Sequence, residues 1–221
     1  MIVVAAGNGV RLAAGTPKAF APLCGEPLLA HALRGVLVCA EIAHVIVVAP
    51  ASHLHEARGI AGVDQRVEDV AGGADRAASV KAGLGALHPD DGIVLVHDAA
   101  RPLAPAALFT RVIHAVRAGH PAVVPGLAVP DTIKVVDADG RVQATPDRES
   151  LRAVQTPQGF LREVLEHAHA EGTGSTDDAG LVERVGGHVL VVDGDPRAFK
   201  VTSALDLAVA AALMQDGSHD N

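Results

Sequence analysis

The chain has very few aromatic side chains. It contains four Phe and neither Trp nor Tyr, so aromatics make up 2% of the residues although 49% are hydrophobic. Its core must therefore be built largely from Ala, Val and Leu. The missing Trp and Tyr also remove the platforms on which single-strand binders stack bases. We expect no nucleic-acid partner.

Positive charge and long apolar runs are also scarce. Lys and Arg number 18 against 26 Asp and Glu, and the formal net charge of −8 disfavours a broad surface for nucleic acid or an anionic membrane. Apolar runs end well before the roughly 18 residues that cross a bilayer, and no cleavable signal is recognisable. Cys24 and Cys39 lack C-x-x-C spacing. We expect a cytoplasmic protein with no membrane partner.

Paired metal-ligand spacing is missing as well, although the chain has 12 His. No H-E-x-x-H run occurs, and His53/His55 and His167/His169 lie two residues apart, which on a helix turns them to different faces. We interpret these side chains as solvated or structural.

What the sequence does contain is an alternation of amphipathic helices and apolar strands. Leu, Ala and Val recur at helical spacing over 27–40, ahead of the continuous apolar segment Val45–Ala49. Because strand, helix, strand order gives right-handed parallel crossovers, we predict an α/β fold: one Rossmann-like domain with a mostly parallel twisted sheet flanked by helices. Further helices are predicted at 52–61, 76–87, 105–118, 160–170, from 178 to about 186, and 204–214, and further strands at 65–70, 93–96, 122–124, 189–192 and 199–201.

Residues 131–156 differ from the rest because apolar residues are sparse there. Asp139-Gly140 is a hairpin turn signal, and Ile133, Val135 and Val142 suggest two flanking strands. A hairpin of this size cannot bury its apolar side chains alone. We therefore expect a protruding β-arm that mediates a homodimer, within a domain spanning 1–215, and a disordered polar tail at 216–221.

The segment 3–20 has the character of a phosphate-binding loop. Gly7 and Gly9 allow backbone N–H groups to approach an anion, because no Cβ stands in the way. Arg11 offers forked contacts to phosphate oxygens and Lys18 a compact charge. An ordinary strand-to-helix turn with two solvated cations is the alternative.

Two well-known phosphate loops do not fit this segment. A Walker loop needs Gly-Lys followed by Ser or Thr, whereas Lys18 stands between Pro17 and Ala19. A dinucleotide fingerprint needs a small residue where Leu12 stands, which argues against a dehydrogenase. The pattern A-A-G-x-G-x-R followed by P-K is instead similar to the loop of nucleotidyltransferases that act on sugar or polyol phosphates.

A second motif, Gly72 to Val80, places a double glycine before a helix that carries Ser79. Backbone groups and a hydroxyl at such a helix start could read the edge of a base. A plain loop closed by an Asp75 N-cap is the alternative.

A third motif, Val96 to Pro102, follows a predicted strand and carries Asp98. Ligands of parallel sheets bind beyond the carboxyl ends of the strands, and hard cations prefer carboxylate and phosphate oxygens. Asp98 is therefore a candidate to hold Mg²⁺ bound to a triphosphate. A structural pair between Asp98 and Arg101 is the alternative.

Taken in order, these motifs resemble the 2-C-methyl-D-erythritol 4-phosphate cytidylyltransferase family over essentially the whole chain. The resemblance rests on AAGNGVR at 5–11, PK at 17–18, GGADRAASV at 72–80, VHDAARP at 96–102, PDTIK at 130–134, DR at 147–148, TPQGF at 156–160, TDDA at 176–179 and KVT at 200–202. It implies that CTP and methylerythritol phosphate react with Mg²⁺ present, giving the cytidine diphosphate derivative and pyrophosphate for non-mevalonate isoprenoid synthesis.

The resemblance also implies site residues, position by position. It assigns nucleotide binding to Ala5, Ala6, Gly7, Gly9, Gly73, Ser79, Asp98 and Ala99. It assigns the polyol phosphate to Arg101, Thr132, Arg148, Thr156, Thr176 and Lys200, and catalysis to Arg11, Lys18, Arg148 and Lys200. A ribitol-5-phosphate cytidylyltransferase and a catalytically silent nucleotide-binding regulator remain the alternatives.

Overall fold

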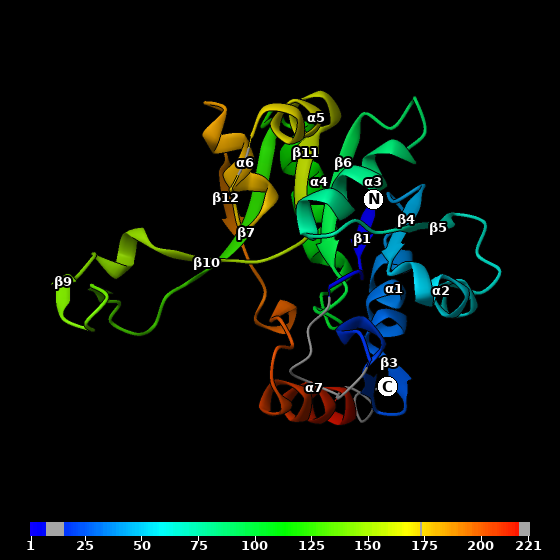
Figure 1. Ribbon diagram of the computed structural model, residues 1–221, viewed down its shortest axis with the longest axis horizontal. Helices are drawn as coiled ribbons and strands as arrows, with labels where there is room; N and C mark the ends of the chain where they lie inside the picture. The colour runs from blue at the N-terminus through cyan, green and yellow to red at the C-terminus, as the bar shows by residue number, and fades with distance from the viewer. Residues whose placement is uncertain (8–15, 173, 217–221) are drawn as a thin grey trace.

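A mostly parallel sheet forms the centre of the computed structural model, which describes residues 1–7, 16–172 and 174–216 (Figure 1). Its strands are β1 Ile2–Val4, β4 Val45–Ala49, β5 Val67–Ala71, β6 Ile93–Asp98, β7 Ala122–Ala128, β10 Arg152–Val154, β11 Gln158–Leu161 and β12 Leu190–Asp193. Their order is β10-β7-β11-β6-β1-β4-β5, and β12 pairs with β7. The β10 and β11 strands run antiparallel to their neighbours, whereas the other paired strands are parallel.

Helices cover both faces of this sheet. They are α1 Leu28–Val38, α2 Leu54–Ala61, α3 Arg76–Gly85, α4 Ala106–Arg117, α5 Arg162–Glu171, α6 Asp178–Arg184 and α7 Ala204–Asp216. The α1, α2 and α4 helices pack on the face that carries Val45 and Val47. The α3, α5 and α6 helices pack on the opposite face, with Ile46 and Val48. These two layers confirm the predicted α/β fold.

The buried side chains explain how the chain manages with so few aromatics. All five residues of β4 are fully buried, since a parallel strand between two helical layers has no solvent-facing side. Ala, Val, Leu and Ile dominate both core clusters, as expected from the composition. Among the helices described, none is both long and apolar enough to span a membrane.

Two secondary-structure predictions are wrong. Residues 158–161, where a helix was expected from 160, form β11, and Gly159 lets this strand approach Val112 of α4 closely, because a Cβ there would lie 2.5 Å from Val112 Cγ1. Residues 199–201, expected as a closing strand, follow the 3₁₀ helix η4 Pro196–Ala198 and form no strand. Val201 is instead buried against Leu28 and α7, so its apolar character reflects packing rather than sheet pairing.

The predicted hairpin is present and projects from the body (Figure 1). It consists of β8 Val135–Val136, β9 Val142–Ala144 and the 3₁₀ helix η3 Arg148–Ser150. Its turn is closed by Asp137, which accepts backbone N–H groups of Asp139 and Arg141, and Gly140 takes a φ of +79°. The return segment joins the main sheet at β10, so residues 152–156 belong to the body rather than to the arm.

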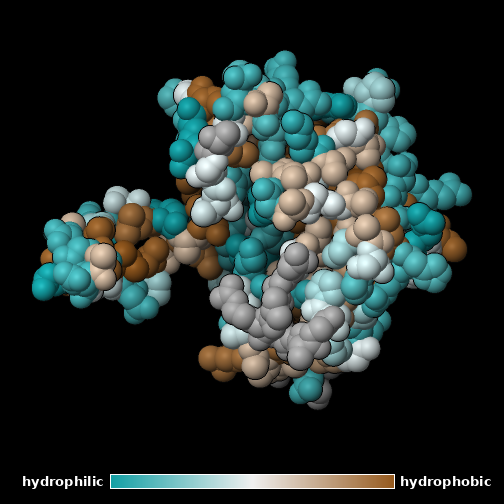
Figure 2. Space-filling view, viewed as in Figure 1, coloured by the Kyte–Doolittle hydropathy of each residue, from teal (hydrophilic) through white to brown (hydrophobic). Residues whose placement is uncertain are grey.

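Apolar side chains of the arm face solvent in the single chain. Ile133, Val135, Val136 and Val142 are between 38% and 58% exposed, and Figure 2 shows apolar side chains gathered on the arm. The homodimer inferred from this pattern remains a prediction. At the carboxyl end, α7 extends to Asp216, one residue into the expected tail, and the rest of that tail lies outside the described residues.

Close packing of α3 on the sheet gives a stability prediction. A Cβ on Gly83 would lie 2.7 Å from Ile2 Cγ2 and 3.1 Å from Val48 Cγ2, whereas a Cβ on Gly85 meets nothing within 4 Å. We expect Gly83→Ala to lower the free energy of unfolding by about 1–3 kcal/mol through overpacking. Gly85→Ala, on the same helix, should change it by less than about 1 kcal/mol. Urea unfolding compares the two, and equal stabilities would contradict the prediction.

Candidate functional site

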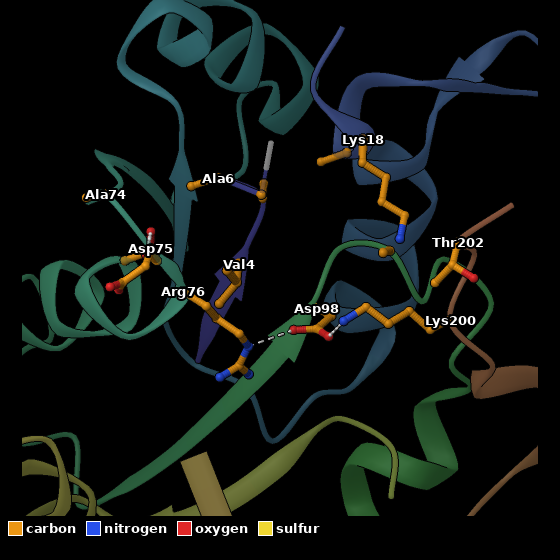
Figure 3. Close-up of a pocket in the computed structure, with 14 residues that line it drawn as sticks. Val4, Ala6, Lys18, Ala74, Asp75, Arg76, Asp98, Lys200 and Thr202 are labelled. Carbon is orange, nitrogen blue, oxygen red and sulfur yellow. Dashed lines mark hydrogen bonds and ion pairs between the residues drawn. The ribbon is translucent and has the colours of Figure 1, made fainter. Parts of the chain in front are cut away.

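A cavity of about 470 Å³ lies at the carboxyl ends of β1 and β6 (Figure 3). One wall is the chain leaving β1 at 4–7, and a second is the start of α3 at 74–79. Lys18, the first residue of the 3₁₀ helix η1 Lys18–Phe20, approaches from a third side, together with Lys200 and Thr202. Asp98 lies at the meeting point of these segments, so the cavity gathers parts of the chain that are far apart in sequence.

The Asp98 carboxylate is held between two cations. Lys200 Nζ lies 2.7 Å from Asp98 Oδ2, and Arg76 Nε lies 3.4 Å from Asp98 Oδ1. The carboxylate is only 10% exposed. Burial alone would raise the pKa of Asp98, but the charges of Arg76 and Lys200 outweigh burial and hold that pKa well below its usual range. Asp98 is therefore ionised at every physiological pH.

Arg76 has a second acidic partner beneath the cavity. Its Nη1 lies 2.7 Å from Oδ2 of Asp178, a carboxylate that is 1% exposed. His169 Nε2 lies 2.9 Å from the other oxygen of Asp178. Burial would lower the pKa of Arg76, but Asp178 and Asp98 raise it. Arg76 thus ties the start of α3 to the end of β6 and to the start of α6.

The turn before α3 packs closely against the first residues of that helix. Asp75 Oδ1 accepts the N–H of Ala78 at 2.8 Å, which is the N-cap considered from the sequence. Ser79 Oγ donates to the Asp75 carbonyl and accepts the N–H of Gly73. A Cβ on Gly73 would lie 2.4 Å from Ala78 Cβ, so only glycine fits there without rearrangement. This wall therefore offers backbone and small side chains to a ligand.

A buried hydrogen-bonded chain supports Asp98 from below. The Asp98 N–H donates to Thr156 Oγ1 at 3.0 Å, and this hydroxyl lies 3.0 Å from His97 Nδ1. His97 Nε2 lies 3.3 Å from the Arg101 carbonyl, which fits a neutral imidazole that donates through Nε2. Burial lowers the pKa of His97 to about 4. Thr156 thus lies under Asp98 rather than in the wall of the cavity.

The structure brings together only some of the predicted site residues. Those in the cavity wall are Ala5, Ala6, Gly7, Lys18, Ser79, Asp98 and Lys200. Gly73 adjoins it through Ser79, and Ala99 is buried behind it. Thr176 is exposed ahead of α6, Thr132 and Arg148 lie on the arm, and Gly9 and Arg11 fall outside the described residues.

Asp98 and Arg101, considered above as a structural pair, make their described contacts with other groups. Asp98 makes its described ion pairs with Arg76 and Lys200, while the Arg101 guanidinium donates to the carbonyls of Ala198 and Val154. Burial lowers the pKa of Arg101. Its Nε is buried with no hydrogen-bond partner among the described atoms. Arg101 therefore fastens the segment ahead of Lys200 to the sheet.

Sequence reasoning missed Arg76 and Thr202 as residues of this site. Arg76 belongs to the motif that predicts a base-recognition segment, and its positive charge close to a double glycine is the signal that points to a site residue. Thr202 lies two residues after Lys200 in the same motif, and its N–H and hydroxyl both donate to Asp206, so it also joins the cavity wall to the first turn of α7.

Comparisons with known proteins agree on one family. The profile of the family described as 2-C-methyl-D-erythritol 4-phosphate cytidylyltransferase matches residues 1–216. A protein of that name from Nocardia farcinica is 51% identical over 213 residues, which cover 96% of this chain and 92% of the relative. Another, from Saccharopolyspora erythraea, is 50% identical over 218 residues, covering 96% of this chain and 97% of the relative.

Solved structures give the same result. The 4-diphosphocytidyl-2C-methyl-D-erythritol synthase of Anaerococcus prevotii superimposes with a TM-score of 0.86 at 31% identity, covering 97% of this chain and 94% of that one. The 2-C-methyl-D-erythritol 4-phosphate cytidylyltransferase of Thermus thermophilus gives 0.77 at 35% identity, covering 97% and 98%.

The role of Arg76 beneath the cavity can be tested by stability. Arg76→Gln leaves the buried Asp178 carboxylate without its guanidinium, so we expect the free energy of unfolding to fall by about 3–5 kcal/mol. The control is Arg34→Gln, because Arg34 is 54% exposed and pairs with Glu26, which is 52% exposed. That change should cost about 1 kcal/mol or less. Denaturant unfolding measures the stability of both variants. A similarly small fall in the free energy of unfolding in both would show that the Arg76–Asp178 pair is not needed for stability.

The neutral His97 predicts a pH dependence. Because its pKa falls from 6.5 to about 4 on folding, the unfolded chain binds more protons between these values. Stability should therefore decline as the pH drops through this window, by about 2 kcal/mol from pH 7 to pH 5. Urea unfolding at the two pH values measures the loss. An imidazole NMR titration that finds His97 protonated in the folded protein at pH 5.5 would refute the assignment.

Proposed function

Because the chain belongs to the 2-C-methyl-D-erythritol 4-phosphate cytidylyltransferase family, we propose that the cavity around Asp98 is where it carries out cytidylyl transfer. The enzyme joins the cytidylyl group of CTP to 2-C-methyl-D-erythritol 4-phosphate in isoprenoid precursor synthesis. The observation that carries the proposal is the set of three cations, Lys18, Arg76 and Lys200, around one cavity that Gly7 also lines. A triphosphate and a substrate phosphate both need such charges.

The walls suit a pyrimidine nucleotide. The 4–7 segment and the 72–79 turn bring backbone and methyl-sized side chains together, and a Cβ on Gly72 would already lie 2.4 Å from Ala6 Cβ. This contact fixes the two walls against each other, and we infer that the backbone and small side chains they offer favour the smaller ring of cytosine over a purine. The family resemblance assigns Gly9 to nucleotide binding and Arg11 to the triphosphate.

The chemistry requires no protein nucleophile. The Ser79 hydroxyl is engaged by Asp75 and Gly73, and His97 is buried below the cavity. The substrate phosphate oxygen therefore attacks the α-phosphorus of CTP in line, and pyrophosphate leaves as the α–β bridge breaks. Lys18 stabilises the charge that develops on the phosphates, while Lys200, fixed by Asp98, orients the incoming phosphate.

Asp98 fits the Mg²⁺ that the family implies. It is a single ionised carboxylate, and Mg²⁺ is commonly bound by one or two carboxylates with substrate phosphates and waters completing its shell. When bound, the ion would neutralise charge on the triphosphate. Asp98 would hold it while keeping Lys200 in place.

In this proposal the arm contributes residues to the site of a second copy of the chain. Arg148 Nη1 donates to the Pro130 carbonyl at 2.7 Å, which fixes the base of the arm, and both Arg148 and Thr132 are exposed there. We assign them to the site of a second copy, reached when two arms exchange across a two-fold axis. The exposed apolar side chains of β8 and β9 would be buried by the same contact.

A cytoplasmic location is part of the same proposal. Cys24 and Cys39 are both free, as expected for a protein of a reducing compartment.

A pyrophosphate-release assay tests the reaction. CTP, UTP and ATP are each combined with 2-C-methyl-D-erythritol 4-phosphate and with ribitol 5-phosphate. We expect turnover with CTP and the methylerythritol phosphate. Turnover with ribitol phosphate alone would support the alternative acceptor, and nucleotide binding without turnover would support a silent regulator.

Lys18 offers the sharpest test of the triphosphate assignment. Lys18→Ala should reduce kcat by at least about 100-fold with the fold intact, because a charge matched to the transition state is lost. Lys81→Ala, a control on the exposed side of α3, should leave kcat within about twofold. Steady-state kinetics with circular dichroism compares the variants. Near-parental turnover of Lys18→Ala would remove Lys18 from the mechanism.

Sharing of the site across a dimer is tested by mixing variants. Lys18→Ala and Arg148→Ala proteins, each inactive alone, are dissociated, mixed and reassociated. In a mixed dimer the body with intact Lys18 receives the arm with intact Arg148, so about a quarter of all sites should recover under random pairing. Subunit exchange is verified with differently labelled proteins. No recovery despite exchange would show that Arg148 acts within its own chain.

A further inference from the structure

A cluster of His44, Glu68 and His88 lies at the opposite edge of the sheet from the catalytic cavity. His44 directly precedes β4, Glu68 is the second residue of β5, and His88 lies in the turn between α3 and β6. All three are therefore near the amino ends of parallel strands, whereas the cavity is at the carboxyl ends. A five-residue strand separates the two edges by about 15 Å. The cluster plays no part in the proposed reaction.

The three side chains converge on one point. Their nitrogen and oxygen ligand atoms all lie within 4.8 Å of one another. Glu68 Oε1 is 3.5 Å from His44 Nε2 and 3.8 Å from His88 Nε2. The ligands of a tetrahedral zinc ion, at 2.0–2.2 Å from the metal, lie about 3.3–3.5 Å apart. Glu68 and His88 are 54% and 62% exposed, so small side-chain movements can close the difference.

The orientation of His44 is set by a fourth residue, Asp91. Asp91 Oδ2 lies 3.2 Å from His44 Nδ1 and also accepts the N–H of His88 at 2.9 Å. Asp91 therefore orients the His44 imidazole, in the way that carboxylates hold metal-binding imidazoles. Through the backbone N–H of His88 it also fixes the turn that carries the second histidine. The turn is further fastened by Arg162, which donates to the His88 carbonyl.

This arrangement leaves His44 Nε2 without a hydrogen-bond partner. The His44 side chain is 10% exposed, and its Nε2 is buried and unsatisfied among the described atoms. With Nδ1–H directed at Asp91, the lone pair of Nε2 faces the Glu68 carboxylate. Two facing acceptors repel each other, and either a proton on Nε2 or a metal ion between them removes that repulsion. The lone pair is the group that a metal ion binds.

We propose that His44, Glu68 and His88 form a zinc site, with water in the fourth position. Two imidazole nitrogens and one carboxylate oxygen suit Zn²⁺, whereas Mg²⁺ and Ca²⁺ select oxygen ligands. The ion would link the starts of β4 and β5 to the turn after α3.

Calorimetric titration with ZnCl₂ tests the site. The full-length protein is stripped with a chelator and titrated in excess Mg²⁺, so that weak binding at Asp98 does not contribute. We expect one Zn²⁺ per chain, lost or weakened more than 100-fold in His88→Ala and Glu68→Gln, and weakened 10- to 100-fold in Asp91→Asn. The matched control is His120→Ala, an exposed histidine at the turn after α4, which should bind as the parent does.

One further readout separates a metal site from a protonated His44, and another separates the site from the proposed reaction. Zn²⁺ should raise the unfolding midpoint of the parent and of His120→Ala but not of His88→Ala. Turnover without added zinc should be the same in all these proteins, because none of the changes touches the cavity. The proposal is overturned if the parent binds no Zn²⁺ at 100 μM, or if His88→Ala and the parent bind it equally.

Discussion

Charge neutralisation of the buried Asp98 is the constraint on which the site depends. A carboxylate that is only 10% exposed must have cations close to it, and here they come from two segments that are far apart in the sequence. Arg76 arrives at the start of α3, and Lys200 arrives after the arm, β12 and η4. Both cations are thereby held at the cavity before any phosphate is present, which is how positioning contributes to phosphoryl chemistry.

The antiparallel strand β11 supports this arrangement from inside the sheet. It lies between β6 and β7 and carries the chain away from Thr156, whose hydroxyl accepts the N–H of Asp98 and contacts the neutral His97. The same return segment leads back from the arm through β10. The arm is thus joined to the site by only a few residues, so contacts made by the arm act close to Asp98.

The two edges of the sheet present opposite chemistry. At the carboxyl edge, the cations Lys18, Arg76 and Lys200 favour anions. At the amino edge, His44, Glu68 and Asp91 present lone pairs and negative charge, which favour a cation. A parallel sheet produces this separation naturally, because all of its strands end on the same side.

The sequence by itself determined the helices, most parallel strands, the hairpin and the motifs at the strand ends, because these follow from apolar periodicity, turn residues and local spacing. Only the tertiary structure decided that 158–161 form a central strand, that Val201 packs under α7, that Arg76 rather than Arg101 pairs with Asp98, and that His44 and His88 meet across Glu68. Each depends on contacts between segments distant in the chain, which local pattern does not encode.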